Sequence, residues 1–169
     1  SGNIYVTGAT SGGLDGNTNS GNSDIFLVKY NSSGTKQWTQ QLGTSVYDYG
    51  TGVSVDNSRN IYLSGSTFGG LDGNTFSGGY SDIFLVKYNS SGTKQWTQQL
   101  GTSGNDYGAG VSVDNSSNIY LAGRTSGGMD GNSNSGNEDI FLVKYNSSGT
   151  KQWTQQFGTS GYEQEPDVT

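Results

Sequence analysis

Cysteine and histidine are both absent from the 169 residues of the chain. Their absence excludes disulfides, thiolate nucleophiles, histidine-based catalytic triads and zinc sites of the usual ligand types. Carboxylate pairs for glycoside hydrolysis remain available, but the Asp residues recur at equivalent positions of a repeat, whereas a catalytic pair needs two unlike environments. The sequence therefore predicts a protein that is not an enzyme and has no cofactor, or Ca²⁺ alone.

Basic residues are few, with 8 Lys and Arg against 14 Asp and Glu, a net charge of -6 and a pI near 4.3. No run of Lys or Arg offers a polyphosphate a positive surface, so nucleic acid is not an expected partner. The longest apolar run is "IFLV", far below the roughly 20 residues that span a bilayer. An acidic, Asn/Ser/Thr/Gly-rich composition is typical of bacterial exterior proteins, so the predicted location is extracellular or the cell surface.

Apolar residues are also scarce, at 29%, while Gly occurs 29 times. The 11 Tyr, 6 Phe and 3 Trp are nevertheless too many aromatic residues for a solvated coil, and large rings let a few positions bury much area. The composition predicts a folded, turn-rich protein. The chain begins "SGNIYV" with neither an initiator Met nor a signal peptide, so we expect a processed or shortened form.

One eighteen-residue block, "DIFLVKYNSSGTKQWTQQ", occurs three times without a substitution, at Asp24–Gln41, Asp82–Gln99 and Asp139–Gln156. The full repeat is about 57 residues, as the spacing of the tryptophans shows. This length suits a propeller blade of four strands with one long loop. Because every blade of a radial array meets the same neighbours, one interface can be reused unchanged.

Each repeat contains four strand-like segments and no window with a helical period, so almost no helix is expected. In the first copies the segments are "TGVSVD" (51–56), "NIYVTG" (3–8), "DIFLVKY" (24–30) and "TKQWTQQLG" (35–43). The third is apolar on both faces, which predicts burial between two sheets. The fourth is half polar, with Lys36 guarding an outer edge. Gly34 supplies a positive φ for a hairpin with a bulge, and "DNSRN" at 56–60 forms a similar turn.

The pieces "VDxSxNIYLxG" and "DxFLVKYNSSG", in this order and spacing, resemble the bacterial seven-bladed β-propeller repeat family, SBBP, of secreted and surface proteins. The resemblance extends from Ser1 to about Gly161. It implies a β-propeller and an exterior location, and it implies no catalytic activity. The last segment, "YEQEPDVT" at Tyr162–Thr169, departs from the pattern "YDYGTGVSV" and predicts a degenerate closing strand.

The predicted fold is all-β: one partial β-propeller domain over 1–169, with three four-stranded blades of about 57 residues. The repeats are approximately 1–49, 50–107 and 108–161, and 162–169 is the closing strand. The chain starts at a second strand and ends at a first, since Val168 aligns with Val53, so one blade is split between the termini. Propellers close with about 4 to 8 blades. Two chains forming a six-bladed homodimeric ring, further blades of a longer chain, and head-to-tail filaments are the alternatives.

The long loop of each repeat carries alternating oxygen-bearing side chains, as in "LDGNTNSGNSD" at 14–24. This pattern resembles a D-x-N-x-N calcium loop, although Ser20 stands where that motif has Gly. The alternative is that Asp, Asn and Gly are turn formers held by side-chain hydrogen bonds. The candidate metal ligands are Asp15, Asn17, Asn19, Asp24, Asp72, Asn74, Asp82, Asp130, Asn132, Asn134 and Asp139.

Aromatic residues in the variable loops form a second candidate site, and they are Tyr47, Tyr49, Phe76, Tyr80 and Tyr107. Rings beside Asn and Asp can stack on sugars, while the alternative role of such rings is packing between blades. The sequence thus predicts a non-catalytic exterior scaffold or recognition module that self-assembles. The alternative function is a carbohydrate-binding, lectin-like propeller with glycans as partners.

Overall fold

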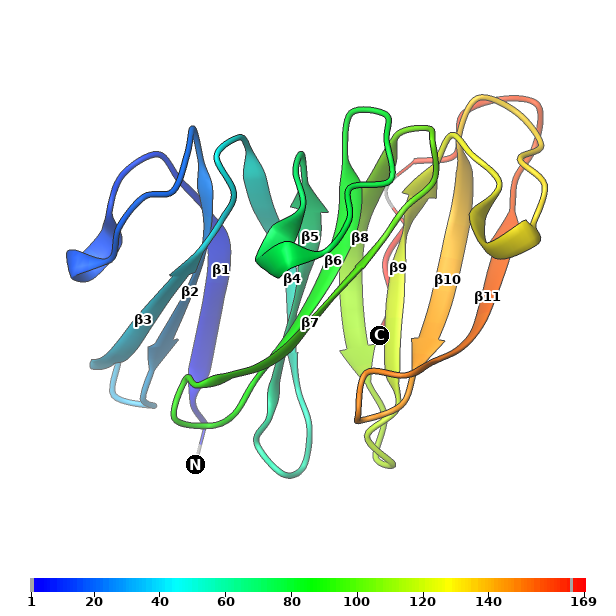
Figure 1. Cartoon of the computed structure of the whole chain (residues 1–169). Coiled ribbons are helices and arrows are strands. Elements are labelled where there is room, and N and C mark those ends of the chain that lie inside the picture. The colour runs from blue at the N-terminus through cyan, green and yellow to red at the C-terminus, as the bar shows by residue number, and fades with distance from the viewer. Residues whose placement is uncertain (1, 165) are drawn as a thin grey trace.

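A computed structural model describes residues 2–164 and 166–169, and in them eleven strands form three antiparallel sheets (Figure 1). The all-β prediction is confirmed. The helical residues described are three short 3₁₀ turns, one in each long loop: η1 (Leu14–Gly16), η2 (Leu71–Gly73) and η3 (Met129–Gly131). None of the described helices is long and apolar enough to cross a membrane.

The strands follow the repeat, so that the first sheet has three strands and the others have four. The first sheet comprises β1 (Ile4–Thr10), β2 (Asp24–Tyr30) and β3 (Lys36–Leu42). The second comprises β4 (Asp48–Val55), β5 (Ile61–Thr67), β6 (Asp82–Tyr88) and β7 (Lys94–Leu100). The third comprises β8 (Asp106–Val113), β9 (Ile119–Thr125), β10 (Asp139–Tyr145) and β11 (Lys151–Phe157).

Local sequence explains the turns that connect these strands. In the "NSSG" hairpin the Asn31 carboxamide oxygen accepts the amide N–H groups of Ser33 and Thr35, and Gly34 has a φ of 76°. The register shifts by one residue at Lys29 and Tyr30, which is the predicted bulge. In the "DNSRN" turn Arg59 adopts a φ of 65°. The predicted turn chemistry is therefore confirmed at both places.

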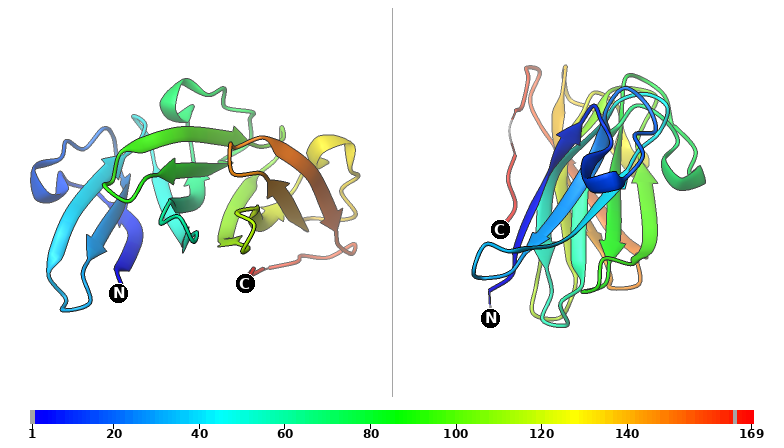
Figure 2. Two further views of the ribbon diagram at one scale, coloured as in Figure 1. Left: turned by 90° about the horizontal axis from the view of Figure 1, so that it is seen from below. Right: turned by 90° about the vertical axis from the view of Figure 1, so that its left-hand side faces the viewer.

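The three sheets stand side by side with their faces in contact, and the N-terminal strands β1, β4 and β8 lie along one edge of the arc (Figure 2). Strand β6 is buried on both faces, as predicted. Its Phe84 and Val86 belong to the core shared with the first sheet, while Ile83 and Leu85 belong to the core shared with the third sheet. The apolar residues thus lie in two layers between sheets, here called the first and second junctions.

Each junction also contains one hairpin contact that repeats. At the first junction a Cβ on Gly92 would lie 3.1 Å from the Trp38 ring, and the Lys29 ammonium donates to the Ser90 carbonyl at 2.9 Å. At the second junction Gly149 approaches Trp96 in the same way, and Lys87 donates to Ser147 at 2.8 Å. The Trp and Lys of the verbatim block therefore receive the hairpin of the following sheet.

The predicted closing segment, 162–169, leaves the third sheet along its inner side. Tyr162 forms a parallel bridge with Glu138, and residues 163–164 and 166–169 form no strand. Val168 lies against Gly110 of β8, with its Cγ1 3.6 Å from where a Gly110 Cβ would stand. Gly110 itself lies against Gly52 of β4 in a similar way, so the segment takes the place that an inner strand of a following sheet would occupy.

Candidate functional site

A cavity of about 460 Å³ opens at the second junction, near the ends of the strands that carry the long loops. Its walls come from β4 and β5 on one side and from β8 and β9 on the other. The lining residues are Tyr49, Thr51, Ser66, Phe68, Tyr107, Gly108, Ala109, Arg124, Gln164 and Pro166. The volume of the cavity and its lining of aromatic rings with a few polar groups are typical of a small-molecule site.

One wall of the cavity is an aromatic cluster. The Tyr47 and Tyr49 rings are stacked with centroids 6.1 Å apart, and the edge of Phe68 packs 5.8 Å from Tyr49. The Phe68 amide N–H donates to the Tyr47 carbonyl at 3.0 Å, which holds the segment after β5 beside the start of β4. Tyr49 remains 38% exposed, so its ring is accessible to a ligand.

The opposite wall carries a fixed positive charge. The Arg124 guanidinium lies 4.6 Å from the centroid of the Tyr107 ring and donates to Glu138 at 2.6 Å. A cation over a ring and a charge-assisted hydrogen bond both restrict its orientation. The arrangement combines stacking surfaces with strong donors and acceptors, which suits recognition of a polar ligand with apolar faces.

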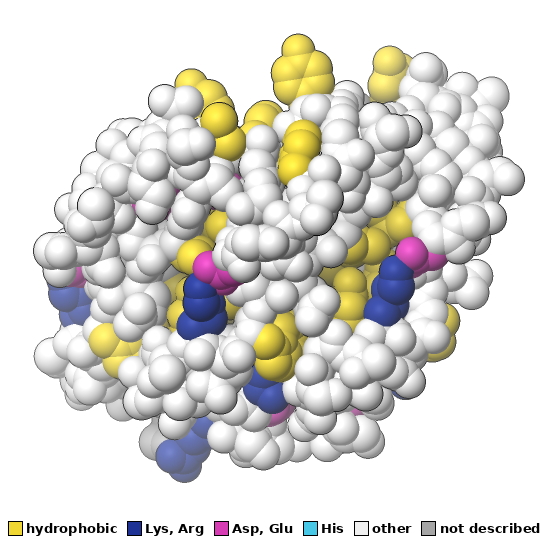
Figure 3. All heavy atoms as spheres, viewed as in Figure 1, with side chains coloured by type: hydrophobic (Ala, Val, Ile, Leu, Met, Phe, Trp, Pro, Cys, Tyr) yellow, Lys and Arg dark blue, Asp and Glu magenta, His cyan; other side chains and the backbone are white. Residues whose placement is uncertain are grey.

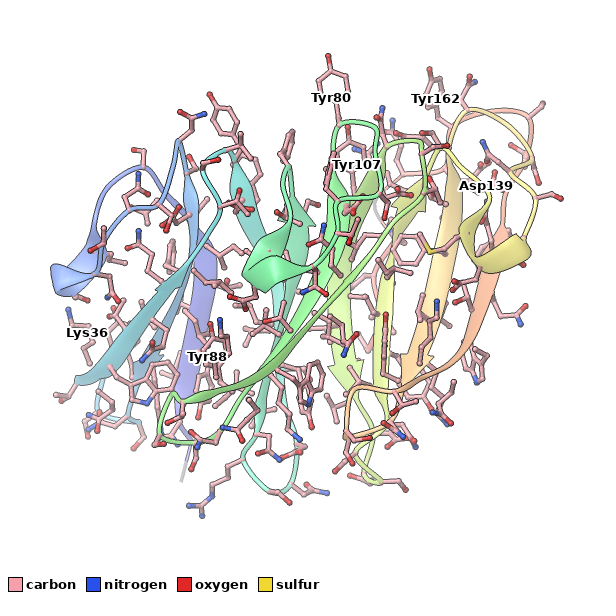
Figure 4. The ribbon with its side chains drawn as sticks, viewed as in Figure 1. Lys36, Tyr80, Tyr88, Tyr107, Asp139 and Tyr162 are labelled. Carbon is pink, nitrogen blue, oxygen red and sulfur yellow. The ribbon has the colours of Figure 1, made fainter. Side chains whose placement is uncertain are left out.

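The structure brings together only some of the predicted aromatic residues. Tyr49 and Tyr107 lie in strands β4 and β8, and not in loops as predicted, and they face the same cavity. Tyr47 stacks behind Tyr49. Tyr80 is 70% exposed at the tip of the loop between β5 and β6, where it projects away from the sheets (Figure 4). Phe76 is half-buried in that same loop. Neither of these two residues lines the cavity.

Arg124 and its ion pair with Glu138 were not predicted, although the repeat contains a signal for them. The aligned residues of the second copy are Ser66 and Ser81, so two serines are replaced together by an ion pair. Phe68 likewise aligns with Ser126. These substitutions between copies of the repeat lie around one cavity. They distinguish the second junction from the first in a chain whose copies are otherwise nearly identical.

The predicted loop ligands divide into three groups that face different partners. Asp15, Asp72 and Asp130 pair with Lys36, Lys94 and Lys151. Figure 3 shows acidic side chains lying against basic ones on one face of the molecule. The amides of Asn17, Asn74 and Asn132 donate to the first carbonyl of each 3₁₀ turn, and those of Asn19 and Asn134 donate to Gly21 and Gly136. Asp24, Asp82 and Asp139 are buried at strand starts.

No group of three or more His, Cys, Asp or Glu side chains placed to hold a metal occurs within residues 2–164 and 166–169. One pair of carboxylates does occur. Asp82 at the start of β6 and Asp106 at the start of β8 are both fully buried, and both border Gly101. Burial raises the pKa of Asp106, aided by the Asp82 charge and opposed by hydrogen bonds from Thr125 and Thr102. Asp82, one of the predicted ligands, thus lies next to Asp106, which the loop pattern did not include.

The fold defines a class of protein, namely an all-β repeat protein whose successive antiparallel sheets pack face to face. Residues 37–72 and 95–128 match the SBBP beta-propeller repeat. The predicted family resemblance is therefore confirmed in these two regions.

Two proteins are similar over most of the chain. Regulatory protein FlaEY of Caulobacter vibrioides is 27% identical over 187 residues, which is 99% of this chain and 20% of that protein. An uncharacterized WD repeat-containing protein, L264, of Acanthamoeba polyphaga mimivirus is 28% identical over 177 residues, or 88% of this chain and 13% of that protein. The chain thus spans a fifth or less of the length of either relative.

Proposed function

We propose that the chain is a non-catalytic β-propeller scaffold and recognition module that acts outside the cell and assembles with a second copy of itself. Each sheet serves as one blade, and the three-stranded first sheet is the incomplete one. The acidic, Asn- and Ser-rich composition supports the exterior location. The names of the two relatives, a regulatory protein and a WD repeat-containing protein, are compatible with an interaction role.

The observation that carries the assembly is the hairpin contact of the verbatim block. Trp38 and Trp96 each receive the hairpin of the following sheet, whereas Trp153 is 39% exposed. At the other end of the array, the hairpin at Gly34 has open space beside it. The third sheet therefore offers an unused Trp, and the first sheet offers the hairpin that fits it.

The same two sheets expose apolar residues that their equivalents bury. Ile4 is 51% exposed, while the aligned Ile61 and Ile119 are at 0%. Phe157 on β11 is 58% exposed, while the aligned Leu42 and Leu100 pack against the cores. Head-to-tail contact of the third sheet with the first sheet of another copy would cover both surfaces with the interface already used twice within the chain.

Two copies joined in this way at both ends would give a closed ring of six blades, a number within the range at which propellers close. In that ring residues 166–169 of one copy would take the inner position beside β1 of the other. Further blades of a longer chain would contact the same uncovered faces of the first and third sheets. The proposed interface therefore also applies if the blades belong to one longer chain.

Native mass spectrometry and light scattering at micromolar concentration test the assembly, and we expect the mass of two chains. The variant Trp153→Arg should yield a folded monomer, because this ring is exposed within one chain and its replacement disturbs no internal core. Circular dichroism should remain unchanged.

The matched control is Tyr80→Arg, which introduces the same side chain at a 70% exposed aromatic position in the loop between β5 and β6, outside the proposed interface. It should leave the dimer mass unaltered. A strictly monomeric mass for the parent chain at micromolar concentration would contradict the six-bladed ring, and a dimer that survives Trp153→Arg would exclude this interface.

The cavity favours carbohydrate binding as a second function. Tyr49 and Phe68 offer ring faces, and the Arg124–Glu138 pair offers a donor and an acceptor, which are the groups that sugar hydroxyls and pyranose faces use. A glycan array tests this function with Tyr49→Ala as the loss variant and Tyr80→Ala as the control. Silence of the parent chain on the array would remove it without affecting the assembly.

A further inference from the structure

Carboxylates meet in pairs at both junctions and beside the segment that follows β11. At the second junction the Asp106 amide N–H donates to the Ser81 carbonyl at 2.9 Å, which brings Asp106 beside Asp82. Both side chains are at 0% exposure. Asp24 and Asp48 occupy the same places at the first junction, where the Asp48 amide donates to Ser23 at 2.8 Å. Asp139 and Glu163 form the third pair, and Figure 4 shows Asp139 at the loop end of β10.

Neutral groups donate hydrogen bonds to at least one oxygen of each of these carboxylates, but some of the other oxygens accept none. Oδ2 of Asp106 accepts the Thr102 amide at 2.6 Å and the Thr102 hydroxyl at 3.1 Å. Oδ2 of Asp82 accepts the Ser77 amide and the Gln99 side-chain amide at 2.8 and 2.9 Å. Oδ1 of Asp82 is buried and has no hydrogen-bond partner. Oδ1 of Asp24 and Oδ1 of Asp139 are also buried and have no hydrogen-bond partner.

The unpartnered oxygen and the other carboxylate of the pair border the same glycine. A Cβ on Gly101 would collide with Asp82 Oδ1 and would lie 3.1 Å from Asp106 Oδ2, so both oxygens border one residue that has no side chain. A Cβ on Gly158 would likewise collide with Asp139 Oδ1 and lie 2.7 Å from Glu163 Oε2, which is also unpartnered. The repeat therefore places two acidic oxygens together at each of these glycines.

No ion pair among residues 2–164 and 166–169 offsets this charge. The four ion pairs among the described residues use Asp15, Asp72, Asp130 and Glu138 as their acids, and none of these belongs to a junction pair. Two ionised carboxylates that are buried together without a counter-charge are strongly unfavourable, and the cost increases when one oxygen lacks any donor. A bound cation would remove both costs.

We propose that the junction carboxylate pairs bind hard cations, and specifically Ca²⁺, with Asp82 Oδ1 and the Asp106 carboxylate as acidic ligands at the second junction. Calcium takes oxygen ligands in flexible geometry, and the Thr102 and Thr125 hydroxyls lie against the same Asp106 carboxylate. The site joins two sheets, so a bound ion would cross-link neighbours in the array. This inference does not depend on the ring or on carbohydrate binding.

The full chain, freed of metal with a chelator, tests the proposal by native mass spectrometry and thermal melting at constant ionic strength, with CaCl₂, MgCl₂ and NaCl in separate arms. We expect two or three calcium ions per chain. At free calcium about 100 times the Kd, each occupied site should raise Tm by about 5–10 °C.

The variant Asp82→Asn keeps the shape of the side chain and removes one charge. It should bind one calcium fewer, and in chelator it should melt no lower than the parent, because an amide at the position of Oδ1 can donate to Asp106. A carboxylate that serves only as a hydrogen-bond acceptor would give a different result, because its replacement would lower Tm in chelator and leave the number of bound calcium ions unchanged. Asp106→Asn gives the same test if Asp82→Asn does not fold.

The control is Asp72→Asn, which removes a loop carboxylate that is paired with Lys94. It should keep the full calcium count. A parent chain that binds no calcium and shows no change in Tm would overturn the proposal. Loss of calcium in Asp72→Asn but not in Asp82→Asn would assign the ion to the long loop, and an equal response to NaCl would replace calcium by a monovalent ion.

Discussion

At the scale of the residue, identical side chains occupy unequal environments. Trp38 and Trp96 are half-buried under neighbouring hairpins, while Trp153, in the same eighteen-residue block, is exposed because no further sheet follows it in the described chain. The burial of these tryptophans thus depends on the presence of a neighbouring sheet. Their rings pack against a Tyr two strands away in the same sheet, at 6.1 to 6.2 Å between centroids.

The turn carboxylate Asp114 gives a pH prediction at this scale. Hydrogen bonds from the Asn118 side chain, at 2.7 Å, and from the turn amides lower the pKa of Asp114. A carboxyl whose folded pKa is lowered adds stability above its ordinary pKa, and this stability is lost as pH falls through the folded pKa. Asn118→Ala should raise the Asp114 pKa and reduce stability at neutral pH, with the difference from the parent disappearing in acid.

Carbon-detected NMR titration of the Asp114 carboxyl, with urea unfolding at pH 7 and pH 3, measures both effects. Asn60→Ala in the equivalent turn should leave the Asp114 titration unchanged, because that turn belongs to another sheet. An Asp114 pKa that does not move in Asn118→Ala would contradict this explanation.

At the scale of the element, the outer strand holds the long loop in place through one glutamine. Gln99 accepts the Leu71 amide at 2.8 Å and donates to the Gly69 carbonyl at 3.1 Å and to Asp82 at 2.9 Å. Gln41 and Gln156 make the same three kinds of contact in their own sheets. This explains why the outer strand, which is half polar, repeats without change.

Gln99→Ala should therefore destabilise the chain by about 1–2 kcal/mol, because it leaves the half-buried Leu71 amide and the Asp82 carboxylate short of partners. Hydrogen exchange of the Leu71 amide should accelerate. Gln95→Ala, on the exposed part of the same strand, should change neither quantity, since Gln95 bonds only the nearby Thr93 carbonyl. Equal effects of the two variants would show that loop anchoring is not the reason for the repeated Gln.

At the scale of the whole molecule, the two end sheets decide the behaviour of the array. The middle sheet is covered on both faces, and its β5 strand is buried at every position. The first and third sheets each have one uncovered face with exposed Ile4, Val6, Trp153 and Phe157. If these faces join two copies, stability depends on protein concentration by mass action.

The Tm of the parent chain should accordingly rise between about 1 and 100 μM, whereas the Tm of Trp153→Arg should not depend on concentration. Differential scanning calorimetry across this range provides the measurement. A parent Tm that is independent of concentration would argue that the end sheets stay uncovered in solution or are covered by other segments of a longer protein.

Much of the fold was predictable because its signals are local. The strand periods, the Gly34 turn and the double burial of β6 each follow from residues within about ten positions of one another. The candidate site was less predictable, because its residues come from four strands and the tail. Tyr49 and Tyr107 were identified as loop aromatics, but Arg124 gained its role only by contact with Tyr107 and Glu138.

The sequence by itself determined the repeated sheet, since strand alternation, turn glycines and a verbatim block dictate the same hydrogen-bonded unit three times. Only the tertiary structure decided which copies of identical residues are covered, which carboxylates meet at Gly101, and where the departures from the repeat gather. The physical reason is that local conformation depends on neighbours along the chain, whereas burial and charge pairing depend on which sheet packs against which.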